Sequence, residues 1–239
     1  MNELNTNENE YINPTPDRIV DKKIFEFVSD FIIPRIQGDD LLELGVGDQI
    51  WTPKLIKRFK SVTTVEASSE LIVQLQRKID QPNWKAVLSY FEEYKPQERF
   101  DVVLATYVLE HVKDPLLIMT LAKNFWLKPR GRFALVVPHA LSLHRRLACT
   151  MGVAAHPGEL KETDRRMGHT HCFTYLEIEK LLIDAGFKIL EKKGMFTKTL
   201  PNGMLTHCSD EQLRGLFNLG MELPIEYSAA IYFLAESLS

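Results

Sequence analysis

The chain has 239 residues, of which 45% are hydrophobic and 26% are charged. This composition is typical of a globular protein that is long enough to form one sizeable core. The formal net charge of -3 gives no overall basic surplus to hold a phosphate backbone, which argues against a nucleic-acid partner. No apolar run approaches the roughly 20 residues needed to cross a bilayer, which argues against a membrane partner.

Two features bear on compartment and domain boundaries. The N-terminal residues are rich in Asn and Glu and lack the apolar core of a signal peptide, which predicts a flexible tail over residues 1–16. Residues 17–239 are then predicted to form a single domain. Cys149, Cys172 and Cys208 have no close C-x-x-C spacing, so we expect free thiols in a cytoplasmic protein. The sequence leaves the oligomeric state open.

The first predicted helix spans about residues 15–31, ends before Pro34 and has an apolar face made of Ile19, Val20, Ile24, Phe25, Phe27 and Val28. From residue 38 to 138, strands and helices alternate, which is typical of an open parallel sheet with helices on both faces. The strands are predicted at 40–44, 62–66, 84–88, 100–105 and 132–137. The helices between them are predicted at 52–59, after Ser68 (with core positions Leu71, Ile72, Leu75 and Ile79) and from Asp114-Pro115.

The second part of the chain has a different character. Residues 139–172 are rich in His, Arg and small residues and are too long for a simple connection, which predicts an insertion on the substrate side. Capping boxes begin at Thr174 and Ser209 and predict helices that end near Gly186 and Gly220. Two further strands are predicted at 187–191 and 229–235.

A glycine-containing turn follows the first strand of the sheet. Gly45 and Gly47 allow the backbone to bend sharply and to approach a ligand closely. Some twenty residues later, the second strand ends on Glu66, which is placed to accept hydrogen bonds from a ribose diol. The pair predicts a nucleoside-containing cofactor. Ile50 stands where a dinucleotide-binding turn has its third glycine, so an NAD(P)-dependent oxidoreductase is the weaker alternative.

Three motifs in the same order resemble the class I S-adenosylmethionine-dependent methyltransferases. Their first motif, E/D-x-G-x-G-x-G, matches residues 43–49, with Gln49 in place of the last glycine. A strand that opens Phe-Asp and is followed by Leu-Glu-His-Val matches residues 100–112. A Leu-x-Pro-Gly-Gly turn matches residues 127–131, with Arg130 in place of one glycine. The resemblance covers about residues 38–140 and implies an α/β, Rossmann-like open sheet that is mostly parallel, with an antiparallel last strand.

The resemblance also implies where the cofactor S-adenosylmethionine binds. Glu66 is expected to bind the ribose, and Glu43 to shape the site around the methionine part and the turn amides; as alternatives, both are ordinary charged residues. Tyr90 and Phe91 are expected to lie by the adenine, or else to be core residues. The full predicted set of cofactor-binding residues is Glu43, Gly45, Gly47, Gln49, Glu66, Ala67, Tyr90, Phe91 and Thr106.

Histidines dominate the candidates for catalysis and acceptor binding. His111 and His144 are candidate bases, with a histidine at a helix start as the alternative for His111. The predicted acceptor-binding residues are Tyr107, His139, His144, Arg145, His169 and His171, for which a solvated helix face and a cap are the alternatives. We predict no metal site, because the spacing of these histidines has no H-E-x-x-H form.

The leading hypothesis is S-adenosylmethionine-dependent methyl transfer to an oxygen or nitrogen of a small metabolite, such as a sugar, a quinone or a natural-product intermediate. A neutral amine acceptor needs no base, whereas a hydroxyl does. The chain lacks the Asn/Asp-Pro-Pro-Tyr run of the adenine and glutamine methyltransferases, because it has Ala105-Thr106-Tyr107-Val108 there. A cofactor-binding protein without turnover remains as a further alternative.

Overall fold

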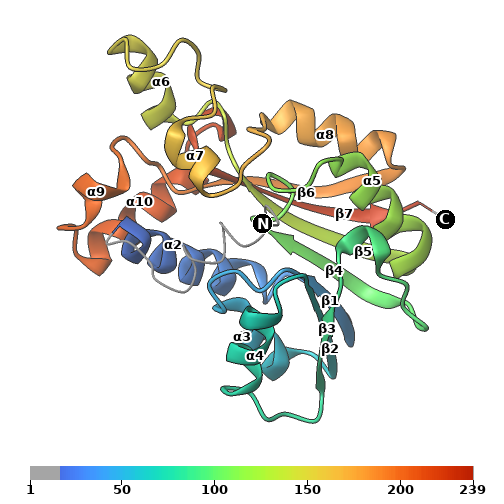
Figure 1. Cartoon of the computed structure of the whole chain (residues 1–239). Coiled ribbons are helices and arrows are strands. Elements are labelled where there is room, and N and C mark those ends of the chain that lie inside the picture. Colours follow the sequence, from blue (N-terminus) through green and yellow to red (C-terminus); the bar gives the residue numbers. More distant parts are fainter. Residues whose placement is uncertain (1–16, 239) are drawn as a thin grey trace.

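The computed structural model describes residues 17–238, so the predicted tail over residues 1–16 lies outside the described part. A seven-stranded sheet carries helices on both faces (Figure 1). The strands are β1 Asp40–Leu44, β2 Ser61–Glu66, β3 Trp84–Leu88, β4 Phe100–Thr106, β5 Leu127–Pro138, β6 Phe187–Met195 and β7 Ala230–Ser237. The α-helices are α2 Asp17–Ile32, α3 Trp51–Arg58, α4 Ser69–Gln76, α5 Pro115–Leu121, α6 Leu143–Thr150, α7 Glu162–Arg166, α8 Tyr175–Asp184, α9 Asn202–Leu205 and α10 Asp210–Glu222.

The order of the strands in the sheet is β3-β2-β1-β4-β5-β7-β6. The pairs among β1 to β5 are parallel, and β7 runs antiparallel to both of its neighbours. The predicted fold class is therefore confirmed, including the antiparallel last strand. From β1 the strand order runs through β2 to β3 on one side, whereas β4 lies on the other side of β1. The strand order therefore reverses between β1 and β4, and a ligand cleft is expected beyond the carboxyl ends of these two strands.

Alternate side chains of the central strands supply two separate cores. In β4, Val102 and Leu104 belong to the core under α2, α3 and α10, while Val103 and Ala105 belong to the core under α5 and α8. Burial on both faces explains the unbroken apolar run of this strand. One position on α2 was predicted wrongly, because Ile19 is 57% exposed and faces away from the core.

Local signals placed most boundaries correctly. Ser68, Asp114, Thr174 and Ser209 each accept a hydrogen bond from a backbone amide in the first turn of the helix that follows. Differences arise where pairing or packing extends or shortens an element. β6 continues to Met195 because β7 pairs along its whole length, and α4 ends at Gln76, so that Ile79 packs against the core from beyond the helix.

The turn before the fifth strand is absorbed into β5, which begins at Leu127 and is irregular before Arg132. Arg130 stands where the resembling family has glycine, and its φ is +60°, in the left-handed region. Its guanidinium lies 3.5 Å from Glu236 and is largely exposed, so this ion pair adds little stability.

We therefore expect Arg130→Gly to raise the free energy of unfolding by about 1 kcal/mol, because glycine adopts a positive φ without a side-chain clash. Urea denaturation of the variant and the wild type measures the difference. Arg132→Gly is the matched control, and it should lose stability because Arg132 lies in the regular part of the strand. Equal losses in the two variants would contradict the assignment of strain to Arg130.

The segment 139–172 carries α6 and α7, and Figure 1 draws these two helices close together, apart from α2 and α3 on the other side of the sheet. Its two ends are fixed to the sheet region. His139 donates its backbone N–H to Ala229, and Ala140 donates its own to Phe173, 2.7 Å away. Within residues 17–238, no helix combines the length and the apolar character that a membrane span requires.

Candidate functional site

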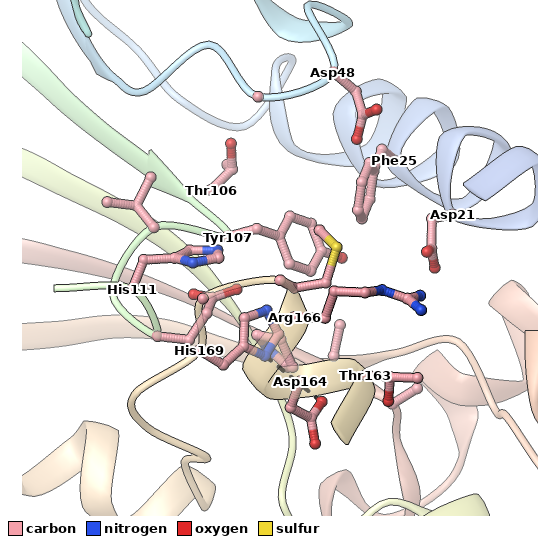
Figure 2. Close-up of a pocket in the computed structure, with 18 of the residues that line it drawn as sticks. Asp21, Phe25, Asp48, Thr106, Tyr107, His111, Thr163, Asp164, Arg166 and His169 are labelled. Carbon is pink, nitrogen blue, oxygen red and sulfur yellow. Dashed lines mark ion pairs between the residues drawn. The ribbon is translucent and has the colours of Figure 1, made fainter. Parts of the chain in front are cut away.

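A cavity of about 1460 Å³ opens at the carboxyl ends of β1, β2 and β4. Its walls come from α2, from the turn after β1, from the loop after β4 and from the segment that carries α6 and α7. Figure 2 shows side chains from these elements converging, with Asp21 and Phe25 of α2 facing Arg166 and Thr163 of α7. Because ligand cavities commonly hold about 300–1,000 Å³, this one has room for a cofactor and a second small molecule.

The glycine turn forms one wall of the cavity. Gly45 has a φ of +73°, which favours glycine. A Cβ atom at this position would lie only 3.3 Å from a methyl group of Val108, so a larger residue would be crowded there. Gly47 also lines the cavity with a φ of +41°. Gln49 takes the left-handed conformation that the family's glycine provides, with a φ of +60°. Its side-chain amide donates a hydrogen bond to Gln74 and accepts one from a lysine, and neither partner lines the cavity. Gln49 therefore stabilises the turn from outside the cavity.

Glu66 stands at the end of β2 with its carboxylate held against the turn. Oε2 accepts the backbone N–H of Val46 at 3.1 Å, and Oε1 accepts that of Ser68 at 2.8 Å. A carboxylate accepts several hydrogen bonds at once, so these backbone contacts are compatible with binding of the two hydroxyls of a ribose. The fixed carboxylate and the bare backbone at Gly45 therefore fit a nucleoside cofactor, and Glu66 and Ala67 both line the cavity.

Glu43 does not line the cavity, and its side chain is buried inside the protein. Its Oε2 accepts hydrogen bonds from the hydroxyls of Thr52 and Thr64, both at 2.8 Å. Burial raises the pKa of Glu43 to about 7, against the lowering effect of these two bonds. Glu43 therefore joins β1, β2 and α3 from inside, and a direct contact with the cofactor stays a prediction without support from its position.

This raised pKa predicts a pH dependence of stability. The unfolded chain titrates Glu43 near 4.5 and the folded protein near 7, so stability is fully present below 4.5 and declines as the pH rises to 7. The loss is about 3 kcal/mol at most, since one pKa unit corresponds to about 1.4 kcal/mol. Glu43→Gln keeps the shape and removes the titration. Urea denaturation at pH 5 and at pH 8 measures the free energy of unfolding of both proteins. The variant should be more stable relative to the wild type at pH 8 than at pH 5. The same difference between the two proteins at both pH values would contradict the pKa shift.

The expected adenine side of the cavity is lined by Tyr90 and Phe91. Tyr90 is 44% exposed and follows β3, whereas Phe91 also packs against the core under α5 and α8. Phe91 therefore has a core contact and also lines the cavity, and its expected contact with adenine stays a prediction. Thr106, the last residue of β4, also lines the cavity, as its position at the end of a central strand predicted.

The loop after β4 begins with an uncommon backbone conformation. Tyr107 has a φ of +56°, and its ring packs on Phe25 of α2 with the ring centroids 4.4 Å apart. The carbonyl of Glu110 in this loop accepts the backbone N–H groups of Thr170 and His171 at 2.7 and 3.2 Å. These bonds bring the end of the segment 139–172 against the loop, so residues some sixty positions apart form one wall.

His111 and His169 meet through this contact, with ring centroids 4.8 Å apart and the rings nearly perpendicular (Figure 2). Burial lowers the pKa of His111 to about 3, and the neighbouring His169 lowers it further. Glu110 lies beside them, fully buried, and burial raises its pKa to about 7. The two histidines were predicted from the sequence, but Glu110 was not. A charged residue inside the apolar run 108–112 is a signal that could have identified it.

The other predicted histidines have different surroundings. His139 is buried, with Nδ1 3.1 Å from the carbonyl of Ser228, and burial lowers its pKa to about 4. Burial also lowers the pKa of His144 to about 2, helped by the charges of nearby Lys198 and Arg145. Both residues line the cavity as neutral, weakly basic imidazoles. His171 does not line it, because its ring stacks on Phe173.

Arg145 borders the cavity, but its guanidinium is engaged within the segment 139–172. One terminal nitrogen contacts both carboxylate oxygens of Asp164 at 2.9 and 2.8 Å, and the other donates to the carbonyls of Pro157 and Glu159. Burial would raise the pKa of Asp164, but the neighbouring His169 and the Arg145 charge hold it below its usual range. Arg145 thus has a structural role in this segment, and its expected contact with an acceptor stays a prediction.

A second ion pair, which the sequence did not suggest, connects α2 to the glycine turn. Arg18 of α2 pairs with Asp48, and both side chains are buried. Burial raises the pKa of Asp48, and the Arg18 charge opposes that change. α2 is thereby fixed over the same turn that would bind the cofactor. No sequence pattern pointed to this pair, since the partners are 30 positions apart and each is an ordinary charged residue.

Comparison with known proteins places the whole arrangement in a family. A family of methyltransferase domains matches residues 17–192, which is more than half of the chain. A methyltransferase of Haloferax volcanii, solved in complex with the Trm112 methyltransferase activator, has a TM-score of 0.66 at 13% identity over 93% of both chains. A Bacillus halodurans methyltransferase has a TM-score of 0.60 at 15% identity, covering 90% of this chain and 99% of its own.

A third solved structure is the N-methyltransferase NodS from Bradyrhizobium japonicum in complex with S-adenosyl-L-homocysteine. Its TM-score is 0.58 at 13% identity, covering 95% of this chain and 91% of that one. At these identities the solved structures establish the fold, while the family match carries the activity and favours it over the oxidoreductase alternative. No curated protein matches the chain. From its sheet, its glycine turn and this match, the chain belongs to the methyltransferase-domain family and is an S-adenosylmethionine-dependent methyltransferase.

Proposed function

We propose that this enzyme transfers a methyl group from S-adenosylmethionine to an oxygen or nitrogen of a small metabolite. The observation that carries the proposal is the size of the cavity, about 1460 Å³, which is lined by α2 on one side and by the segment that carries α6 and α7 on another. A cofactor on the glycine turn leaves space in this cavity for one further small molecule.

The walls around the remaining space combine apolar and polar side chains. Phe25 and Tyr107 give an aromatic surface on the side of α2, and Met151 and Val153 line the cavity from the residues after α6. Polar side chains, His139 among them, line the same cavity. An acceptor with an apolar body and one or two polar groups suits both kinds of side chain, as is usual for small-molecule sites.

The bound cofactor supplies an electrophilic methyl group, which the acceptor lone pair takes while the carbon–sulfur bond breaks and its electrons pass to sulfur. The protein holds the two reactants in line and excludes water. In this arrangement Glu66 anchors the ribose, and the turn at Gly45 allows close approach. His144 has a pKa of about 2 and is a weak proton acceptor, so its predicted role as a base gains no support.

The segment 139–172 supplies the acceptor side of the site in this proposal, within one domain that spans residues 17–239. It is bound to the loop after β4 through the Glu110 carbonyl, and its own two helices are held together by Arg145 and Asp164. The shape of this wall of the cavity therefore depends on internal contacts of the segment, and substitutions within it should change acceptor choice more than cofactor affinity.

A transfer assay tests the proposal. Purified protein is incubated with S-adenosylmethionine carrying a labelled methyl group and with panels of small hydroxylated or amino compounds, and labelled products are identified by mass spectrometry. We expect label in at least one class of small molecule and in neither bulk RNA nor a denatured protein extract. Label that appears only in RNA or in protein would overturn the proposal, and so would binding of the cofactor without transfer to any panel.

A further inference from the structure

Three side chains form a compact group on the acceptor side of the cavity. Glu110, His111 and His169 each offer one potential ligand atom, and these atoms all lie within 4.8 Å of one another. Both carboxylate oxygens of Glu110 are buried, and neither accepts a hydrogen bond from another residue in the described part of the chain. A buried carboxylate in this condition is unfavourable unless it is protonated or a cation compensates its charge.

Both imidazole rings are oriented by groups behind them. His169 turns Nδ1 toward Asp164, whose Oδ1 is 3.6 Å away, and Asp164 is fixed in turn by Arg145 (Figure 2). The ring of His111 interacts with the backbone of Gly168. Metal-binding histidines are commonly held in this way, with one ring nitrogen on a carboxylate or a backbone carbonyl and the other on the metal. Each ring therefore has one nitrogen left to serve as a ligand.

We propose that Glu110, His111 and His169 bind a divalent transition-metal ion. Two imidazoles and one carboxylate suit Zn²⁺, Mn²⁺, Fe²⁺ or Co²⁺, whereas Mg²⁺ and Ca²⁺ prefer oxygen ligands alone. Bonds of about 2.0–2.2 Å place ligand atoms roughly 3–4 Å apart, so small side-chain rotations complete the site. The sequence analysis expected no metal because it considered only the histidines, and His139, His144 and His171 take no part in this group.

Three protein ligands leave coordination positions open, as in catalytic metal sites. All three side chains line the cavity, so those positions adjoin the space assigned to the acceptor. Resting on the proposed function, this inference narrows the acceptor to one with a hydroxyl beside a second oxygen, such as a vicinal diol or a catechol. Both oxygens can ligate the cation, which lowers the pKa of the hydroxyl so that its proton passes to solvent before oxygen takes the methyl group.

Titration with Co²⁺ tests the site without any acceptor, because bound Co²⁺ absorbs visible light in a way that depends on its ligands. The full-length protein, freed of metal by a chelator, should bind one equivalent. Glu110→Gln and His169→Ala should each weaken binding by at least about 100-fold, since removal of a direct ligand exceeds the 10–100-fold loss typical of an outer partner. His207→Ala, which removes an exposed histidine outside the cavity, should bind Co²⁺ as the wild type does.

Circular dichroism and the affinity for S-adenosylhomocysteine identify variants that fail to fold, and both should match the wild type in Glu110→Gln. A wild-type protein that binds S-adenosylhomocysteine but no Co²⁺ overturns the metal site and leaves the proposed function standing. Equal Co²⁺ binding by the wild type, Glu110→Gln and His169→Ala overturns it as well. Co²⁺ binding that depends on Glu110 and His169 in a protein without methyl transfer supports the site and removes the proposed function.

Discussion

Replacing Glu66 by alanine should raise the dissociation constant of S-adenosylmethionine by at least about 100-fold. The carboxylate is fixed at the end of β2 by the amides of Val46 and Ser68, so it meets the ribose without a large loss of conformational freedom. Hydrogen bonds to a charged group contribute about 1.5–3 kcal/mol each, and loss of two exceeds a factor of 100. Isothermal titration calorimetry measures the change directly.

Two further variants separate recognition from stability. Glu66→Gln keeps the volume and the capacity to accept hydrogen bonds but loses the charge, so its affinity should lie between those of the wild type and the alanine variant. Glu70→Ala removes an exposed carboxylate from the first turn of α4 and should bind as the wild type does. If all three variants bind the cofactor alike, Glu66 does not hold the ribose.

Replacing Arg145 by methionine should lower the free energy needed to open the segment 139–172 by about 3–5 kcal/mol. The Arg145 side chain is buried, and its removal leaves the partly buried Asp164 carboxylate without its charged partner and two carbonyl groups without their donor. Limited proteolysis should then cleave this segment at least about 100-fold faster, because cleavage follows the population of the opened state.

Arg77→Met is the matched control, since it removes an exposed arginine and should leave the cleavage rate unchanged. The cofactor side is separate from the Arg145–Asp164 pair, so the affinity for S-adenosylhomocysteine should change less than the cleavage rate in the Arg145 variant. An unchanged rate of cleavage within residues 139–172 would show that the ion pair does not hold the segment closed.

The parallel sheet could be predicted because its signals are local. β1 and β3 have the expected bounds, and each predicted N-cap begins a helix, since apolar runs, glycines and capping residues act on their immediate neighbours. The errors come from tertiary pairing. Leu127 joins β5 through its pairing with β4, and Ile19 lies on the exposed side of α2, which an apolar residue count does not reveal.

Most residues predicted to bind the cofactor or the acceptor line the cavity, and their roles there stay predictions. Gly45 and Glu66 belong to strand ends whose positions follow from the topology of the sheet. Arg145 was expected to meet an acceptor but binds Asp164, and Glu110 was passed over although it lies beside His169 in space. Contacts of this kind depend on how the segment 139–172 folds back on the loop after β4, which no periodic pattern in the sequence encodes.

The central claim is that the glycine turn and Glu66 bind a nucleoside sulfonium cofactor. Titration calorimetry of the wild-type protein with S-adenosylhomocysteine, and separately with NAD and NADP, tests it most directly. The account predicts one equivalent of S-adenosylhomocysteine bound and no heat of binding for either dinucleotide. Saturable binding of a dinucleotide with no response to S-adenosylhomocysteine would contradict it.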